Sequence, residues 1–368
     1  MSTKSFNDFV DPSRKDIWRY AKLLEDVKEG SQIDAKQVDF TPIEKVANSP
    51  CKVKREDVSI TGSHKFRSLA YQLSCLRDRG TSKAVLSSSG NAAIAASKLL
   101  PENANLKLLV FLSKKTPSEK LAAIKFTKNL IPILSSRPLR LAKYTIKHFN
   151  LKDLRPSKDP NATIGFRSLG FEIFEQVPRI KNIFSFVTSG ASICGIAEAY
   201  EFLMKSKIIK EIPQLFAVNS SGQLAGSLNG HVANKNLYRV DTSRQNNLSS
   251  GQPNLSSGHR VDKKFVEWTA VDTSRQKDLS SGQAVDKKIC RVDISDTEIL
   301  SIQQKYPQLE TSNEGLASLA AAEKVKPKGE TLVILTGRAW SKEKPDLNKF
   351  FKAENFADVD KIITRHNV

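Results

Sequence analysis

The sequence predicts an α/β protein built on mostly parallel sheets, and three observations support this class. Short runs rich in β-branched residues alternate with amphipathic helical stretches, a pattern typical of βαβ units. The chain has 368 residues, which is enough for one large core or two ordinary ones. Its hydrophobic fraction of 39% is typical of a globular protein in water.

The expected elements follow one another along the chain. Ile17, Tyr20, Leu23 and Leu24 lie at helical spacing and predict a short N-terminal helix over 16–27. Strands are then expected at 51–55, 84–87, 106–112, 183–187, 215–218 and 331–335. Helices are expected at 65–79, 92–100, 119–129, 168–176 and 196–205.

Residues 232–290 interrupt this alternation. The sequence VDTSRQNNLSSGQ at 240–252 recurs almost unchanged as VDTSRQKDLSSGQ at 271–283. Polar segments of this kind have little apolar surface to bury, so we expect a disordered insertion on the surface. Two copies without an apolar face do not make a solenoid, because stacked repeats need a continuous core.

The chain is strongly basic, with 58 Lys and Arg against 39 acidic residues and a formal charge of +19. The lysines are spread over most of the sequence. Their short runs lack the interleaved aromatic residues on which single-stranded nucleic acids stack. We therefore expect a solvated basic surface and no nucleic-acid partner.

Neither a membrane segment nor a metal site is expected. No run of eighteen apolar residues occurs, and the first eleven residues lack the apolar stretch of a signal peptide. The four cysteines lie far apart, without the spacing of zinc ligands: Cys51, Cys75, Cys194 and Cys290. These observations indicate a cytoplasmic protein with reduced thiols.

The first segment with candidate chemistry is TGSHKFR at 61–67, which leads from a turn into a helix. It places Lys65 at a strand-to-helix junction, where ligands bind in open α/β sheets. A lysine amine that is desolvated loses its proton more easily and can form a Schiff base. A solvated lysine at the start of a helix is the alternative.

Three further segments also follow expected strands. Ser87–Asn91 offers hydroxyl and backbone N–H groups that could hold a carboxylate, although a serine-rich helix cap would look the same. The small residues of Thr188–Ser192 permit close backbone approach to a phosphate. The hydroxyl of Thr336 could bond to a ring nitrogen, with a strand-ending turn as the alternative.

Together and in this order, the four segments resemble the fold type II pyridoxal-phosphate enzymes, the tryptophan synthase β-like group. The stretch IWRYAKLLE at 17–25 is similar to threonine synthases. The resemblance covers 16–229 and 292–337. It implies two open, mostly parallel sheets flanked by helices, with the cofactor between two domains. The large cofactor-binding domain would comprise 1–80 and 166–368, and the small mobile domain 81–165.

The resemblance also implies roles for individual residues. Lys65 becomes the Schiff-base lysine and the general base and acid. The residues expected to bind pyridoxal 5'-phosphate are Lys65, Asn91, Thr188, Ser189, Gly190, Ala191, Ser192 and Thr336. Those expected to bind the substrate are Ser63, Ser88, Ser89 and Gly90. No metal is implied.

The implied reaction converts O-phosphohomoserine and water to L-threonine and phosphate, with a small amino acid as substrate and a homodimer as the expected assembly. A threonine or serine dehydratase and a cysteine synthase-like enzyme are alternatives. The chain departs from the family at Ile60, Phe66, Ser68, Thr188 and Ala191. We interpret Phe66 as the loss of a carboxylate near the active-site entrance. A pseudoenzyme that keeps the scaffold as a binding module is therefore a further alternative.

Overall fold

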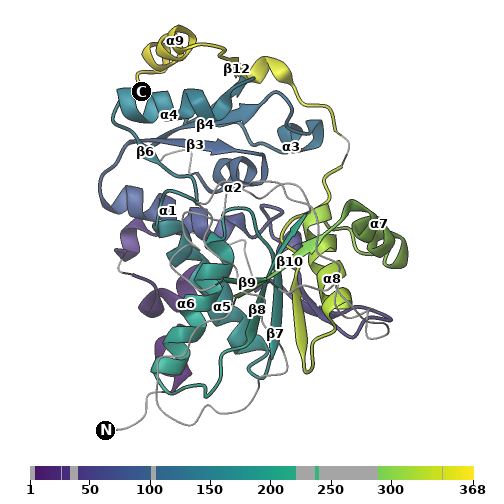
Figure 1. Ribbon diagram of the computed structural model, residues 1–368. Coiled ribbons are helices and arrows are strands. Elements are labelled where there is room, and N and C mark those ends of the chain that lie inside the picture. The colour runs from purple at the N-terminus through teal and green to yellow at the C-terminus, as the bar shows by residue number, and fades with distance from the viewer. Residues whose placement is uncertain are drawn as a thin grey trace, which may run out of the picture.

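The computed structural model describes residues 5–25, 27–33, 40–100, 105–220, 237–239, 289–341 and 343–368. It contains two separate sheets with helices packed on their faces (Figure 1). The expected class, α/β with two mostly parallel sheets, is confirmed. The predicted insertion at 232–290 lies outside the described residues, apart from 237–239 and 289–290.

The larger sheet has seven strands and only one antiparallel pair. Their order is β1 (Ile43–Lys45), β2 (Lys52–Lys54), β11 (Thr331–Ile334), β7 (Asn182–Phe186), β8 (Gln214–Ser220), β10 (Ile289–Ile294) and β9 (Leu237–Arg239). β1 and β2 form the antiparallel pair. β11 lies between β2 and β7, with Ile334 opposite both Lys54 and Ser185. The carboxyl ends of β2, β11 and β7 are therefore level at one edge of the sheet.

Alternating side chains of this sheet contribute to two cores. Ile183 and Leu332 pack with α5 (Asn161–Gln176) and α6 (Ala191–Lys205). Phe184 and Val333 point to the opposite face, which α8 (Asn313–Val325) covers together with α7 (Asp296–Lys305). Strands buried on both faces are typical of parallel sheets between helical layers. Figure 1 shows α5 and α6 on one side of the sheet and α7 and α8 on the other.

The smaller sheet has five strands, all parallel. Their order is β12 (Phe351–Lys352), β5 (Leu130–Ser135), β4 (Lys107–Ser113), β3 (Lys83–Ser88) and β6 (Lys152–Asp153). Its helices are α2 (Asn91–Leu99), α3 (Ser118–Ala122), α4 (Pro138–His148) and α9 (Phe356–His366). Short 3₁₀ helices occupy Phe6–Phe9, Ile17–Leu23, Glu29–Ser31, Glu56–Val58 and Leu347–Lys349.

The C-terminal segment lies on the smaller sheet. β12 pairs with β5, and Val359 and Ile362 of α9 pack in the same core as Leu141 of α4. The domain bounds expected from the resemblance assign these residues to the large domain. A strand of two residues carries no recognisable pattern in the sequence. The domain limits at 80/81 and 165/166 themselves stay predictions.

Several local predictions differ from the structure. The helix expected over 16–27 is a 3₁₀ helix, Ile17–Leu23. The helix expected over 119–129 ends already at Ala122, before a stretch whose β-branched and aromatic residues favour helix weakly. Ten elements were not anticipated, namely β1, β5, β6, β9, β10, β12, α4, α7, α8 and α9. Among the described residues, no helix is long and apolar enough to cross a membrane.

A buried ionic cluster joins α1 (Lys65–Asp78) to β2 and α5. Arg67 Nη2 lies 2.8 Å from Glu56 Oε1, and its Nη1 lies 2.8 Å from Glu172 Oε2. Lys54 Nζ lies 2.6 Å from Glu172 Oε1, and the Thr41 hydroxyl donates to Glu56 over 2.5 Å. All five side chains are buried. Burial alone would raise the pKa of Glu172, but the charges of Arg67 and Lys54 hold it at about 2.

Candidate active site

The candidate residues of the larger sheet emerge at one edge. Lys65 follows β2, Thr336 follows β11 by two residues, and Thr188 follows β7 by two residues. Because the ends of these strands are level and neighbouring strands lie about 5 Å apart, the three loops emerge side by side. Ligands of open α/β sheets bind at this edge.

The lysine turn is attached directly to the end of β11. Ser63 forms an antiparallel bridge with Gly337. The backbone N–H of His64 donates to the Thr336 carbonyl over 3.1 Å, and His64 Nδ1 lies 2.8 Å from the same oxygen. The turn itself needs Gly62, whose φ is +71°. These contacts hold Lys65 at a fixed place beside Thr336.

Lys65 has the surroundings of a reactive amine. It begins α1 and is half-buried, with its Nζ 5.5 Å from the centre of the Phe166 ring. Burial lowers the pKa of the Lys65 ammonium to about 8, and the carboxylate of Glu314 opposes this shift. Burial and the charge of Lys65 together hold the pKa of His64 well below its usual value.

The loop Ser88–Asn91 follows β3 of the smaller sheet. The Ser88 hydroxyl accepts hydrogen bonds from the backbone N–H groups of Gly90 (3.1 Å) and Ala93 (3.2 Å), so it caps α2. Ser89 is exposed, and Gly90 has φ +131°, a conformation that favours glycine. Asn91 is the first residue of α2. The predicted substrate loop is thus present as a strand-to-helix turn.

Thr188–Ser192 joins β7 to α6. Gly190 has a left-handed φ of +79° and precedes the first helical residue, Ala191. The Ser189 hydroxyl lies 3.5 Å from the Ala191 N–H. The first turn of a helix of 15 residues leaves backbone N–H groups without helical partners, and such groups suit a phosphate.

Three buried polar atoms without a hydrogen-bond partner among the described residues lie around Gly337. They are Ser63 Oγ, Asn91 Oδ1 and Ser312 Oγ. A Cβ atom on Gly337 would lie 3.1 Å from Asn91 Nδ2 and 3.3 Å from Ser312 Oγ. Asn91 belongs to the smaller sheet and Gly337 to the larger, so the two sheets meet here. These unpartnered polar atoms next to the lysine turn fit the pyridoxal phosphate that the resemblance implies, since unsatisfied buried polar groups indicate a bound partner.

Sequence reasoning missed four residues of this site and misjudged one. His64, Phe166, Ser312 and Glu314 were not singled out; only His64 lies within a predicted motif, and the others approach through tertiary packing. Phe66 is 1% exposed and packs in the core with α1. The interpretation that Phe66 replaces a carboxylate at the entrance is therefore wrong.

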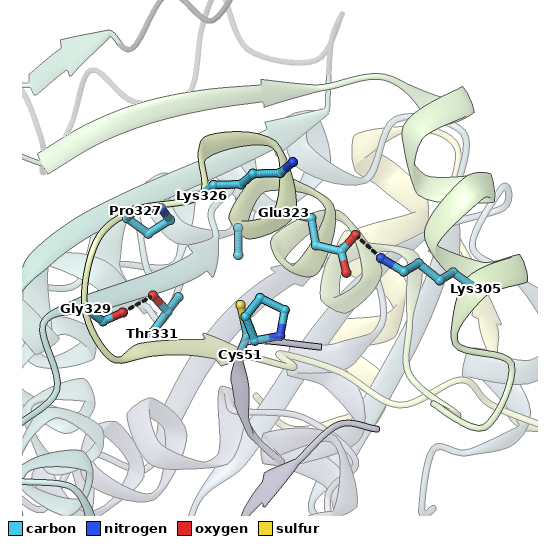
Figure 2. Close-up of a pocket in the computed structure, with 9 residues that line it drawn as sticks. Cys51, Lys305, Glu323, Lys326, Pro327, Gly329 and Thr331 are labelled. Carbon is cyan, nitrogen blue, oxygen red and sulfur yellow. Dashed lines mark hydrogen bonds and ion pairs between the residues drawn. The ribbon is translucent and has the colours of Figure 1, made fainter. Parts of the chain in front are cut away.

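A cavity of about 360 Å³ lies at the opposite edge of the larger sheet. Figure 2 shows the residues that line it. Cys51 and Thr331 lie on it, at the amino ends of β2 and β11. Glu323 pairs with Lys305 over 2.7 Å, and burial raises the pKa of the Cys51 thiol. This cavity is separate from Lys65.

In the described part of the chain, no three His, Cys, Asp or Glu side chains gather as metal ligands.

Comparisons with known proteins show the family and the fold of the chain. A family model described as "Pyridoxal-phosphate dependent enzyme" matches residues 36–337. The biosynthetic L-threonine dehydratase of Lactococcus lactis is 28% identical over 303 residues, which cover 77% of this chain and 65% of the dehydratase. The chain thus spans just under two thirds of that relative.

Solved structures share the fold at low sequence identity. Maize serine racemase matches with a TM-score of 0.56 and 16% identity, over 92% of this chain and 97% of the racemase. A hydrogen sulfide-producing enzyme of Fusobacterium nucleatum matches with a TM-score of 0.57 and 14% identity, over 84% of this chain and 96% of that enzyme. At these identities the likeness supports the two-sheet architecture alone.

Proposed function

Because this chain belongs to the family of pyridoxal-phosphate dependent enzymes, we propose that it is a lyase acting on the side chain of a small amino acid. Members of the family use pyridoxal 5'-phosphate, which is therefore its cofactor. When bound, the cofactor supplies an electron sink that stabilises negative charge on the substrate carbon. The reaction we propose first is threonine synthesis from O-phosphohomoserine and water.

The observation that carries the proposal is the half-buried amine of Lys65. Its pKa of about 8 leaves a substantial neutral fraction near physiological pH, so Lys65 Nζ can accept a proton and return it. An exposed lysine, with a pKa of about 10.4, would be almost fully protonated at physiological pH. We assign Lys65 Nζ as the group that attaches the cofactor and then serves as general base and acid.

Other residues of the site would bind and orient. The N-terminus of α6, with Thr188–Ser192, would hold the cofactor phosphate, and Asn91 would face the ring hydroxyl. Thr336 would present an uncharged hydroxyl to the ring nitrogen, which favours elimination and replacement over amino transfer. Ser63 and the loop Ser88–Gly90 would hold the substrate carboxylate. The rings of Phe166 and Trp340 would help to exclude water.

Two observations point to different substrates. The stretch IWRYAKLLE favours threonine synthase, and its side chains are built into the fold: Tyr20 donates to Glu175 over 2.7 Å, and Arg19 pairs with Glu175 over 2.6 Å. The dehydratase relative favours removal of water from threonine. The two reactions share proton abstraction and loss of a side-chain substituent, so the same residues would serve either.

Product analysis separates these reactions. The protein loaded with cofactor would be offered O-phosphohomoserine, threonine, serine or O-acetylserine with sulfide. We expect threonine and phosphate in equal amounts from the first substrate. 2-Oxobutanoate from threonine, pyruvate from serine, or cysteine from O-acetylserine would instead identify a dehydratase or a cysteine synthase-like enzyme. The Lys65→Ala variant controls for contaminating activity.

The pseudoenzyme alternative makes a different prediction. The chain would then bind the cofactor, and borohydride would fix it to Lys65, but none of the four amino acids would change the visible spectrum or yield product. Departures at Thr188 and Ala191 favour this alternative, because side chains there narrow the phosphate loop. Phe66 does not favour the pseudoenzyme alternative, because its side chain lies in the hydrophobic core.

A further inference from the structure

A second candidate site lies at the edge of the smaller sheet. β4, β5 and β12 are parallel neighbours. β4 and β5 end level at Ser113 and Ser135, and β12 ends one residue short of them, with Lys352 opposite Leu134. A cavity of about 590 Å³ opens beside these ends. The carboxyl ends of parallel strands are where open α/β sheets bind ligands, and this volume suits a small metabolite.

The polar lining of this cavity is positively charged. Lys114, Lys344 and Lys352 line it. Lys114 forms an ion pair with Glu354. Lys344 and Lys352 have no acidic partner within the part of the chain that the structure describes. Two lysine side chains that line one cavity, with no acidic partner among the described residues, favour the binding of an anionic ligand.

One buried hydroxyl lacks a partner at the same place. Thr116 is 8% exposed and lines the cavity, and its Oγ1 has no hydrogen-bond partner among the described residues. A buried polar atom of this kind costs free energy unless a ligand or water satisfies it. Ser118 lines the same cavity, and its hydroxyl donates to Glu119 over 3.3 Å. Hydroxyl and ammonium groups together are suited to the oxygen atoms of a carboxylate or phosphate.

The remaining lining is apolar. Leu121, Leu134 and Leu347 line the cavity, and Leu347 is 49% exposed. Inorganic phosphate alone would leave this surface in contact with water. A ligand with a hydrocarbon part would cover it and gain about 25 cal/mol for each Å² of apolar surface removed from water.

We infer that this cavity binds a small organic anion that joins a carboxylate or phosphate to a hydrocarbon chain. The inference is independent of the reaction at Lys65. The groups that surround Lys65, namely His64, Phe166 and Glu314, come from α1, α5 and α8 and do not line this cavity.

The helix α3 lies between the proposed anion site and the substrate loop. Ser118 and Leu121 of α3 line the cavity. The side chain of Lys120, from the same helix, packs against Gly90. A Cβ atom added to Gly90 would lie 2.7 Å from Lys120 Cδ. A ligand in the cavity would therefore touch the helix that packs on the substrate loop, while remaining outside the Lys65 site.

Calorimetric titration of the cofactor-loaded protein tests this inference, because the cofactor then fills the phosphate site at α6. The probes are hexyl phosphate, hexanoate, inorganic phosphate and 1-hexanol. We expect hexyl phosphate or hexanoate to bind at least tenfold more tightly than either inorganic phosphate or hexanol. The comparison of the first two shows which anion the site prefers.

Variants locate the binding. The double variant that combines Lys344→Gln with Lys352→Gln should bind the amphiphile at least tenfold more weakly. Thr116→Val should weaken binding severalfold. The matched control, Lys328→Gln with Lys361→Gln, removes the same charge from exposed lysines elsewhere and should leave binding unchanged. Equal weakening in both double variants would mean non-specific attraction and overturn the inference. The inference would also be overturned if neither hexyl phosphate nor hexanoate bound, or if the amino-acid substrate displaced the bound amphiphile.

Discussion

His64 Nδ1 lies 2.8 Å from the carbonyl oxygen of Thr336, a residue 272 positions further along the chain. The same oxygen accepts the backbone N–H of His64. Since the carbonyl only accepts hydrogen bonds, Nδ1 must carry the proton. This double attachment places the lysine turn against the end of β11 and so fixes Lys65 relative to Thr336.

The first prediction concerns this histidine and acid stability. The folded protein holds the pKa of His64 well below its usual value, so only the unfolded chain takes up this proton as the pH falls below about 6.5. The free energy of unfolding should therefore fall on acidification. His64→Asn keeps a donor for Thr336 but cannot titrate. Its loss of stability between pH 6.5 and 5 should be smaller than that of the wild type, by up to about 1.4 kcal/mol per pH unit.

Urea unfolding followed by circular dichroism at several pH values measures this difference. Above pH 7 the curves of wild type and His64→Asn should run parallel, because His64 is neutral in both the folded and unfolded states. Parallel curves between pH 5 and 6.5 as well would show that the folded protein protonates His64 normally.

The second prediction concerns the amine of Lys65. With a pKa of about 8, it should react with acetic anhydride in the cofactor-free protein with half-maximal rate near that pH. Glu314→Gln removes the carboxylate that favours the ammonium, so the pKa of Lys65 should fall further. Mass spectrometry of the Lys65 peptide across a pH series measures both values.

The exposed Lys328 provides an internal standard in the same digests. If Lys65 titrates together with Lys328, burial does not perturb the amine and the proposed proton transfers lose their main support. An unchanged Lys65 midpoint in Glu314→Gln would instead show that Glu314 acts on another group.

The parts of this site that sequence could predict are those encoded locally. Lys65 lies in a turn that leads directly into a helix, and the serine loop at Asn91 and the glycine at Gly190 each follow a strand within a few residues. Strand order has no local signal. That β11 lies between β2 and β7, and so brings Thr336 to Lys65, depends on pairing between segments far apart in the chain.

The error at Phe66 has a geometric cause. Successive residues of an α-helix are rotated by about 100°, so the neighbour of an active-site lysine points in another direction. Lys65 faces Phe166, whereas Phe66 enters the hydrophobic core. Glu314 was missed for a different reason, because it reaches Lys65 from α8 and only the folded chain brings them together.

The third prediction concerns the buried ionic cluster. Lys54→Met removes one cation, so Arg67 remains as the positively charged partner of Glu172. The hydrogen bonds of Lys54 to Thr41 and Gln176 are also lost. Breaking one partner of a buried ion pair costs about 3–5 kcal/mol of unfolding free energy. Urea unfolding should show this loss.

Glu211→Gln is the matched control for this prediction, since it breaks the exposed pair with Lys181 and should change stability little. If Lys54→Met is as stable as this control, water reaches the cluster in solution and the charges are not truly buried.

The fourth prediction separates two constraints on Gly62. Its φ of +71° disfavours any side chain, and an added Cβ would lie 2.4 Å from Cζ2 of Trp340. The left-handed backbone alone costs an alanine about 1–2 kcal/mol, so Gly62→Ala should cost more than this in the wild-type background. In a Trp340→Ala background only the backbone cost should remain. A double-mutant cycle by urea unfolding therefore gives a coupling energy that measures the clash. Additive effects would mean that Trp340 does not cover Gly62 in solution.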